Sequence, residues 1–360
     1  MIMIGVYQKR IGPVILRTAT ALWRRPVPGG GPVDIGDAYT HDHRYIFVAH
    51  GRLRCIDIRT GEDLWVAPDT YPFLSAHVTG SGSSFYFSAQ SQVEPRLGAV
   101  FRGSTLTGEA QEITIAPYLD SLNNSSVGAV PEGIIQRVTP ITVNGAEMLA
   151  VHSAFSYEDY GYHSLYRYSF LGLYNPTEGI WVWNTQPPTI WVHKFSATRV
   201  LVHDNMLVCR AVNRVLALEL STGDMVWEKD AVDRDNDNND LVFYNGQIIT
   251  YAALNSSINA ISPIDGEGLW HVNIGYMQFN HLSSKINMLN GVVYVCSGGA
   301  ANAVDLDREV KVWEIFPSTL RKGSDSDGFK ECVAIPGVNG SLGRVVISTN
   351  RAVYCFEAVR

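Results

Sequence analysis

The chain has no stretch of about 18 consecutive apolar residues among its 360, which predicts that no segment spans a membrane. It also lacks an excess of basic side chains: 28 Lys and Arg stand against 35 Asp and Glu, for a formal net charge of −7. Such a balance provides no electrostatic footprint for nucleic acid or anionic lipid. Charged residues make up only 18% and aromatic residues reach 11%, which excludes a disordered chain.

Cysteine is scarce and unpatterned. There are five, an odd number, and none forms a Cys-x-x-Cys motif: Cys55, Cys209, Cys296, Cys332 and Cys355. Most lie in apolar runs typical of strands, so we expect buried thiols in a reducing compartment rather than a disulfide framework. The first 17 residues lack the ordered sections of a signal peptide. These features predict a cytoplasmic or virion location.

A repeat that ends in tryptophan recurs along the chain. Its best copies are Cys55–Trp65 and Ala217–Trp227. In four copies an acidic or polar residue precedes the tryptophan by eight positions, in the pairs Asp57–Trp65, Glu219–Trp227, Ser262–Trp270 and Asp305–Trp313. Gly61 and Gly223 stand at the turn, where a residue without Cβ accepts a positive φ angle. A self-similar unit of this kind predicts a repeat fold.

Three further copies are degraded or divided. Phe85–Ile115 has Glu112 where the tryptophan would fall, and a copy from about Pro140 to Trp181 contains an insertion. The seventh copy is split between the chain ends. Ala352–Glu357 and the strand before it stop short of a tryptophan, and Thr18–Trp23 supplies a lone strand that ends in one. Joining the two would tie the first unit to the last and remove open edges.

A period of about 45 residues fits four short strands, the size of one propeller blade. We therefore predict an all-β, seven-bladed β-propeller spanning residues 18–360 as a single domain, closed by pairing of the N-terminal strand with the C-terminal blade. Residues 1–17 form an N-terminal arm. The positions expected to define the repeat are Trp23, Asp57, Gly61, Trp65, Trp181, Glu219, Gly223, Trp227, Trp270, Asp305 and Trp313.

The pattern Ala-x-Asp-x-x-Thr-Gly-x-x-x-Trp resembles the repeat of quinoprotein-type (PQQ-like) β-propellers. That resemblance implies a propeller fold and leaves function open among dehydrogenases, assembly lipoproteins and non-catalytic interaction modules. The quinoprotein alcohol dehydrogenases use a vicinal disulfide and a calcium ion beside the cofactor, and this chain has no adjacent cysteines. The assembly lipoproteins need an acylated cysteine near the N-terminus, whereas the first cysteine here is Cys55. Both comparisons favour a non-catalytic member.

Two groups of candidate metal ligands are incomplete. Asp233, Asp235 and Asp237 have the alternate spacing of a calcium loop, but Asn238 replaces the turn glycine, and a solvated loop is the simpler interpretation. The second group, His41, Asp42, His43 and His50, has no partners that complete a tetrahedral set. We expect no metal, no cofactor and no catalytic residue.

The strongest functional indication is a tyrosine-rich insertion in the degraded copy before Trp181. Its candidate binding residues are Tyr157, Tyr160, Tyr162, His163, Tyr166 and Tyr168. Clustered tyrosines are common on recognition surfaces, and they also occur in long strands that pack on a neighbour. Both interpretations stay open on sequence alone.

The sequence thus favours a non-catalytic scaffold that binds protein partners in a larger assembly such as a virion or a cytoplasmic complex, with neither nucleic acid nor membrane as a partner. The alternatives are a cofactor-free enzyme that acts on a small molecule in the central funnel, and a quinone- or calcium-dependent dehydrogenase. The apolar arm of residues 1–17 is expected to lie on the propeller face, fill the channel or dock on another chain.

Overall fold

The computed structural model contains strands and no helix within the part that it describes. It describes residues 7–10, 21–26, 38–49, 51–67, 71, 73–116, 132–158, 165–185, 199–211, 214–230, 241–252, 257–273, 285–297, 300–308, 310–316, 329–337, 341–349 and 352–359. Within these ranges, no helix has the length and apolar character needed to cross a bilayer.

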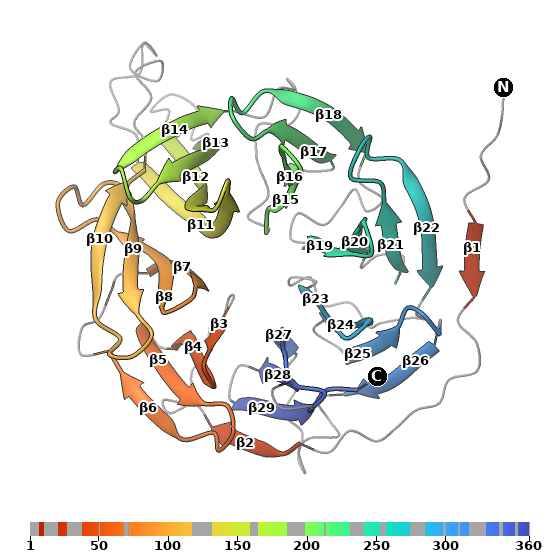
Figure 1. Ribbon diagram of the computed structural model, residues 1–360. Helices are drawn as coiled ribbons and strands as arrows, with labels where there is room; N and C mark the ends of the chain where they lie inside the picture. Colours follow the sequence, from red (N-terminus) through yellow and green to blue (C-terminus); the bar gives the residue numbers. More distant parts are fainter. Residues whose placement is uncertain are drawn as a thin grey trace, which may run out of the picture.

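The described strands form seven antiparallel sheets arranged radially as blades of a ring (Figure 1). Blade 1 comprises β3 (Tyr39–His41), β4 (Arg44–Ala49), β5 (Arg52–Asp57) and β6 (Asp63–Val66). Blade 2 comprises β7 (Phe73–Ser81), β8 (Ser84–Gln90), β9 (Gly98–Ser104) and β10 (Ala110–Ile115). Blade 3 comprises β11 (Glu132–Val143), β12 (Ala146–Glu158), β13 (Leu165–Asn175) and β14 (Ile180–Thr185). Blade 4 comprises β15 (Leu201–His203), β16 (Met206–Ala211), β17 (Arg214–Glu219) and β18 (Met225–Asp230).

The remaining blades complete the ring. Blade 5 comprises β19 (Leu241–Tyr244), β20 (Gln247–Ala252), β21 (Ser257–Ile261) and β22 (Gly268–Asn273). Blade 6 comprises β23 (Lys285–Leu289), β24 (Val292–Ser297), β25 (Ala300–Asp305) and β26 (Val310–Ile315). Blade 7 comprises β27 (Phe329–Ile335), β28 (Arg344–Thr349), β29 (Ala352–Glu357) and the N-terminal β2 (Trp23–Pro26). The predicted seven-bladed propeller is confirmed.

The ring closes as expected. β2 pairs antiparallel with β29, which places Trp23 opposite Cys355 and Arg24 opposite Tyr354. The backbone N–H of Leu22 also donates to the carbonyl of Cys355 at 2.7 Å. The strand begins at Trp23 rather than ending there, so the expected boundary at 18–23 is displaced toward the C-terminus.

Every blade is apolar on both faces, which explains why it cannot exist alone. In β28, Val345 and Ile347 enter the core shared with blade 6, whereas Val346 enters the core shared with blade 1. Successive residues of a strand point to opposite faces, so a run without alternation buries both. Seven such cores, one at each interface, account for the buried apolar residues.

A tryptophan of the outer strand docks on the turn of the next blade at four of these interfaces. The indole N–H donates to the carbonyl of the first turn residue, from Trp23 to Ile58 (2.6 Å), Trp65 to Thr105 (3.1 Å), Trp183 to Leu220 (2.8 Å) and Trp227 to Pro263 (3.2 Å). Each ring lies so close to the turn glycine that a Cβ there would meet it at 2.6–2.9 Å. Each of these contacts thus combines packing of the indole ring with a hydrogen bond.

Blade 3 makes this contact with Trp183 and not with Trp181. Trp183 follows Asn175 by eight residues, and Gly179 occupies the turn with φ 72°. Trp181 instead lies over Gly172 and Tyr174 of its own blade, with ring centroids 5.2 Å apart in the second case.

The other three interfaces lack the complete motif. Blade 2 has Glu112 in the tryptophan position, and a Cβ at Gly179 would meet nothing closer than the Tyr174 hydroxyl at 3.9 Å. Trp270 donates to the Gln247 side chain of its own blade at 2.9 Å. Trp313 is buried between Tyr294 and Phe356 beside the C-terminal strand.

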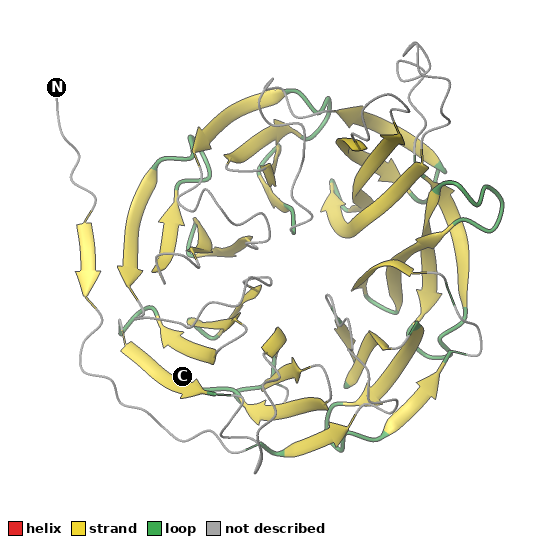
Figure 2. Cartoon of the chain, turned by 180° about the vertical axis from the view of Figure 1, so that it is seen from behind, coloured by secondary structure: helices red, strands yellow, loops and turns green. Residues whose placement is uncertain are grey.

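Part of the N-terminal arm has a position that the sequence did not predict. Tyr7–Arg10 form β1, which pairs in parallel with β22 and makes blade 5 a five-stranded sheet (Figures 1 and 2). The arm therefore adds to the outer rim of a blade that is two positions away from the blade completed by β2.

Two alanine substitutions separate the tryptophan contact from the backbone requirement. Gly61→Ala places a methyl group against Trp23 in a backbone with φ 76°, so we expect the free energy of unfolding to fall by roughly 2–4 kcal/mol. Gly179→Ala has the same positive φ without a ring in contact, and should cost only about 1–2 kcal/mol. Urea unfolding followed by tryptophan fluorescence measures both; equal losses would show that the indole contact adds nothing.

Candidate interaction surface

Blade 3 carries the longest strands of the ring. β12 has 13 residues and β13 has 11, whereas the corresponding strands of blade 4 have six each. Pairing between β12 and β13 continues to Glu158 opposite Leu165, but the described pairing of β14 with β13 ends at Leu171. The described pairing of β12 with β13 therefore continues past the described end of β14, and we name this strand pair the blade 3 hairpin (residues 149–158 and 165–174).

Aromatic residues are register partners in the two strands of the blade 3 hairpin. Tyr157 is the register partner of Tyr166, and Phe155 is the partner of Tyr168. Because residues two apart in a strand share a face, these four positions lie on one face of the hairpin. Val151 on β12 and Phe170 on β13 are at alternate positions of the same face, and both lie in the core between blades 2 and 3. Tyr160, Tyr162 and His163 lie outside the described residues.

A loop of blade 2 lies against the beginning of blade 3. Residues 91–97 connect β8 to β9, Leu97 forms a parallel bridge with Gly133, and the Gly133 N–H donates to the carbonyl of Arg96 at 3.2 Å. The tip residue Val93 is 84% exposed. The loop therefore presents an apolar side chain to solvent beside the beginning of blade 3.

Glu112 anchors this loop. Its carboxylate accepts hydrogen bonds from the Ser91 hydroxyl and from the backbone N–H of Gln92, both at 2.8 Å. The Ser91 hydroxyl in turn accepts from the N–H groups of Val93 and Glu94. The residue that replaces the repeat tryptophan thus fixes a loop on its own blade. Sequence reasoning noted the replacement and missed this consequence.

Polar bonds join blades 2 and 3 where the indole is missing. The Tyr86 hydroxyl donates to the Glu147 carboxylate, the Tyr174 hydroxyl donates to the Ile113 carbonyl at 3.0 Å, and the Thr79 hydroxyl donates to the Val138 carbonyl at 2.7 Å. Burial and the neighbouring Glu147 carboxylate raise the pKa of Tyr86, so its hydroxyl stays a donor at neutral pH.

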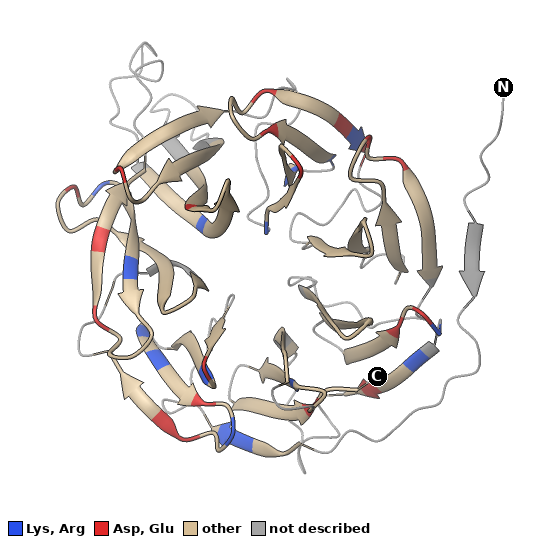
Figure 3. Cartoon of the chain, in the orientation of Figure 1, with Lys and Arg blue, Asp and Glu red and all other residues tan. Residues whose placement is uncertain are grey.

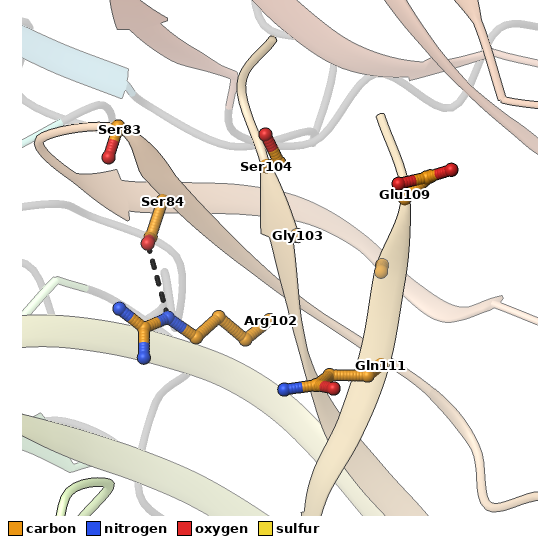
Figure 4. Close-up of a pocket in the computed structure, with 8 residues that line it drawn as sticks. Ser83, Ser84, Arg102, Gly103, Ser104, Glu109 and Gln111 are labelled. Carbon is orange, nitrogen blue, oxygen red and sulfur yellow. Dashed lines mark hydrogen bonds between the residues drawn. The ribbon is translucent and has the colours of Figure 1, made fainter. Parts of the chain in front are cut away.

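A groove of about 440 Å³ lies at the turn end of blade 2 (Figure 4). Hydroxyl, guanidinium, amide and carboxylate groups line it, from Ser83, Ser84, Arg102, Ser104, Glu109 and Gln111. Arg102 donates to the Ser84 hydroxyl at 3.1 Å. The groove therefore offers both hydrogen-bond donors and acceptors to a polar ligand.

The expected histidine group lies at a tight turn. Asp42 and His43 connect β3 to β4 with φ 44° and 63°, and the Nε2 atom of His41 lies 3.2 Å from a carboxylate oxygen of Asp42. No group of three or more metal-ligating side chains occurs in the described ranges. His50 and the aspartates at 233, 235 and 237 lie outside those ranges.

Blade 3 contains two buried basic residues, Arg137 and His152. His152 on β12 is the register partner of Arg137 on β11, and both side chains are almost fully buried. Burial first, and then the positive charges of Arg137 and His77, lower the pKa of His152 to about 3. The imidazole is therefore neutral in the folded protein at physiological pH.

This histidine makes the stability of the fold sensitive to acid. The unfolded chain takes up a proton at His152 near pH 6.5 and the folded chain does not until about pH 3, so between these values stability falls as pH falls. His152→Gln should remove about 1 kcal/mol per pH unit of that dependence. Urea unfolding at pH 7, 6, 5 and 4 tests this; parallel curves for the two proteins would contradict it.

These features define a seven-bladed propeller whose blades are joined by tryptophan docked on turns. A family model described as outer membrane protein assembly factor BamB matches residues 169–360, more than half of the chain. The chain therefore belongs to this family of PQQ-like β-propellers.

Among solved structures, the crystal structure of BamB from Moraxella catarrhalis is similar over 95% of this chain and 98% of that chain, with a TM-score of 0.52 and 11% sequence identity. At that identity the likeness shows the fold alone. No curated protein sequence matches the chain. The family match begins at residue 169, so it includes the last strands of blade 3 and neither the tyrosine insertion nor the N-terminal arm.

Proposed function

We propose that this protein is a non-catalytic binding module that holds a protein partner within a larger assembly. The model of the family to which it belongs is described as an outer membrane protein assembly factor, and this description supports a role in assembly. Here the partner contact is assigned to the blade 3 hairpin and the loop 91–97.

The observation that carries this proposal is the extension of the blade 3 hairpin with paired aromatic residues. Tyrosine provides a large contact area with a hydroxyl that remains satisfied in a wet interface. The hairpin is joined to the propeller through the core that contains Val151 and Phe170, so its base is rigid. A rigid aromatic surface loses little conformational entropy on binding.

A triple substitution tests the surface. We expect Tyr157→Ser, Tyr166→Ser and Tyr168→Ser together to reduce capture of the partner at least tenfold in a quantitative pull-down from the native host, because aromatic anchors supply most interface energy. Ile264→Ser is the matched control, since Ile264 is 72% exposed in a turn between β21 and β22 at the opposite end of the blades. Unchanged capture by the triple variant, with an intact fold by circular dichroism, would refute the assignment.

A second candidate function is favoured by the groove at the turn end of blade 2. Its hydroxyl, guanidinium and carboxylate groups suit a small polar molecule, as expected for a propeller that binds a ligand. Native mass spectrometry separates the two functions: a stoichiometric protein complex agrees with the binding module. A small molecule that co-purifies, and is lost in Arg102→Ala, would favour the groove instead.

We also propose a reducing location, in the cytoplasm or a virion. All five cysteines are free and buried, and burial raises the pKa of Cys55 to about 12 and that of Cys355 to about 11. Buried, protonated thiols are protected from oxidation, and a chain without disulfides does not need an oxidising compartment.

A further inference from the structure

The outer rim of blade 5 shows how this propeller binds an added strand. β22 is the outermost strand of its blade, and β1 extends the sheet by pairing Tyr7 with Trp270 through Arg10 with Asn273. The contact is made between main chains of an edge strand and an extended segment. This is the mode by which many proteins bind peptides.

The sequence of β22 explains why this edge can accept a strand. Edge strands are usually protected against pairing by charged residues or proline. Five of the seven outer strands have such protection: Asp63 in β6, Glu112 in β10, Glu228 to Asp230 in β18, Lys311 and Glu314 in β26, and Arg24 to Pro26 in β2. β22 has neither a charged residue nor proline. β14 (Ile180–Thr185) is the other outer strand that has neither, and Figure 3 shows its lack of charged residues.

β14 differs from β22 in that it ends its sheet. Blade 3 has the strand order β11-β12-β13-β14, and no described strand lies beyond β14. Two tryptophans hold the strand in place, because Trp183 docks on Gly223 toward blade 4 and Trp181 lies over Gly172 in the core shared with blade 2. Ile180 and Val182 are 50% and 42% exposed. The strand is therefore an anchored template with exposed apolar side chains, and no described strand pairs with its second edge.

We propose that the β14 edge binds an extended segment of the partner protein as a fifth strand of blade 3. This inference rests on the proposed function and names the mode of contact. The segment has the chemistry of the chain's own arm, apolar and basic without acidic residues. The first 17 residues carry three basic and no acidic side chains, so the remainder of the chain carries a formal charge of −10. Two exposed acidic residues lie close in sequence to the contacts of β14: Glu178 precedes β14, and Asp224 follows Gly223, on which Trp183 docks.

The arm itself is not the expected occupant of β14. A tethered segment meets its own site at an effective concentration of about 1 mM, far above that of a second copy in solution. The arm therefore remains on β22 and keeps that edge closed. The edge left for a segment from another protein is β14.

The test uses the full chain and a fluorescein-labelled peptide that contains residues 2–12 of the arm. Fluorescence anisotropy should show saturable binding of one peptide per chain. Val182→Lys should raise the dissociation constant at least tenfold, because a charged residue protects an edge strand. Val226→Lys on β18, which is 52% exposed, is the matched control and should stay within twofold of the unmodified chain. If Val182→Lys fails to fold, Ile180→Lys on the same strand replaces it.

Leu269→Lys on β22 identifies the competing site. If the peptide displaced the arm, this variant would change binding and Val182→Lys would not, which would overturn the proposal. Absence of binding to the unmodified chain, or equal binding to all variants, would also overturn it. These outcomes are distinct from failure of the proposed function, because the pull-down with the tyrosine variants does not depend on the peptide. A partner lost with the tyrosines, together with no peptide binding, would leave the function standing and remove the β14 site.

Discussion

The contact on which the ring depends is an indole of one blade placed over the turn of the next. It combines burial of a large aromatic surface with a hydrogen bond from the indole N–H to a turn carbonyl, as between Trp23 and Ile58. A residue with a Cβ at Gly61 would prevent the close approach and strain the positive φ. Because Trp23 comes from the N-terminal strand, the same contact that joins neighbouring blades also joins the chain ends.

The interfaces that lack this indole contact contain other contacts in its place. Trp270 turns its N–H to Gln247 of its own blade, and the sequence has Glu309 where the turn glycine of blade 6 would stand. Between blades 2 and 3 the indole is absent, and side-chain hydrogen bonds such as that from Tyr86 to Glu147 cross the interface. The groove of blade 2, the loop anchored by Glu112 and the long strands of blade 3 all occur beside this interface. The candidate functional features therefore lie at the interface where the sequence departs from the repeat.

The outer rim presents a second constraint. Neighbouring blades of a propeller pack on one another through side chains, and the outer strand of each blade is left with an open main-chain edge. Charged residues protect most of these edges, and the arm covers one that has none. The distribution of charge along the outer strands therefore indicates where another strand can bind. An edge strand without charged residues is open to unwanted pairing unless a defined strand covers it.

The sequence by itself determined the number of blades, the closure by the two chain ends and the family, because the tryptophan repeat reports a periodic local structure that the same short-range rules produce each time. It also located the tyrosine insertion. It did not distinguish Trp183 from Trp181, since the register shift between them, which places Trp183 toward blade 4 and Trp181 toward blade 2, is visible only in the paired strands. The pairing of β1 with β22, the groove of blade 2 and the register of Tyr157 with Tyr166 were decided by tertiary structure alone. Each joins residues that are distant in sequence or unpatterned in spacing, and such contacts depend on which surfaces the closed ring brings together.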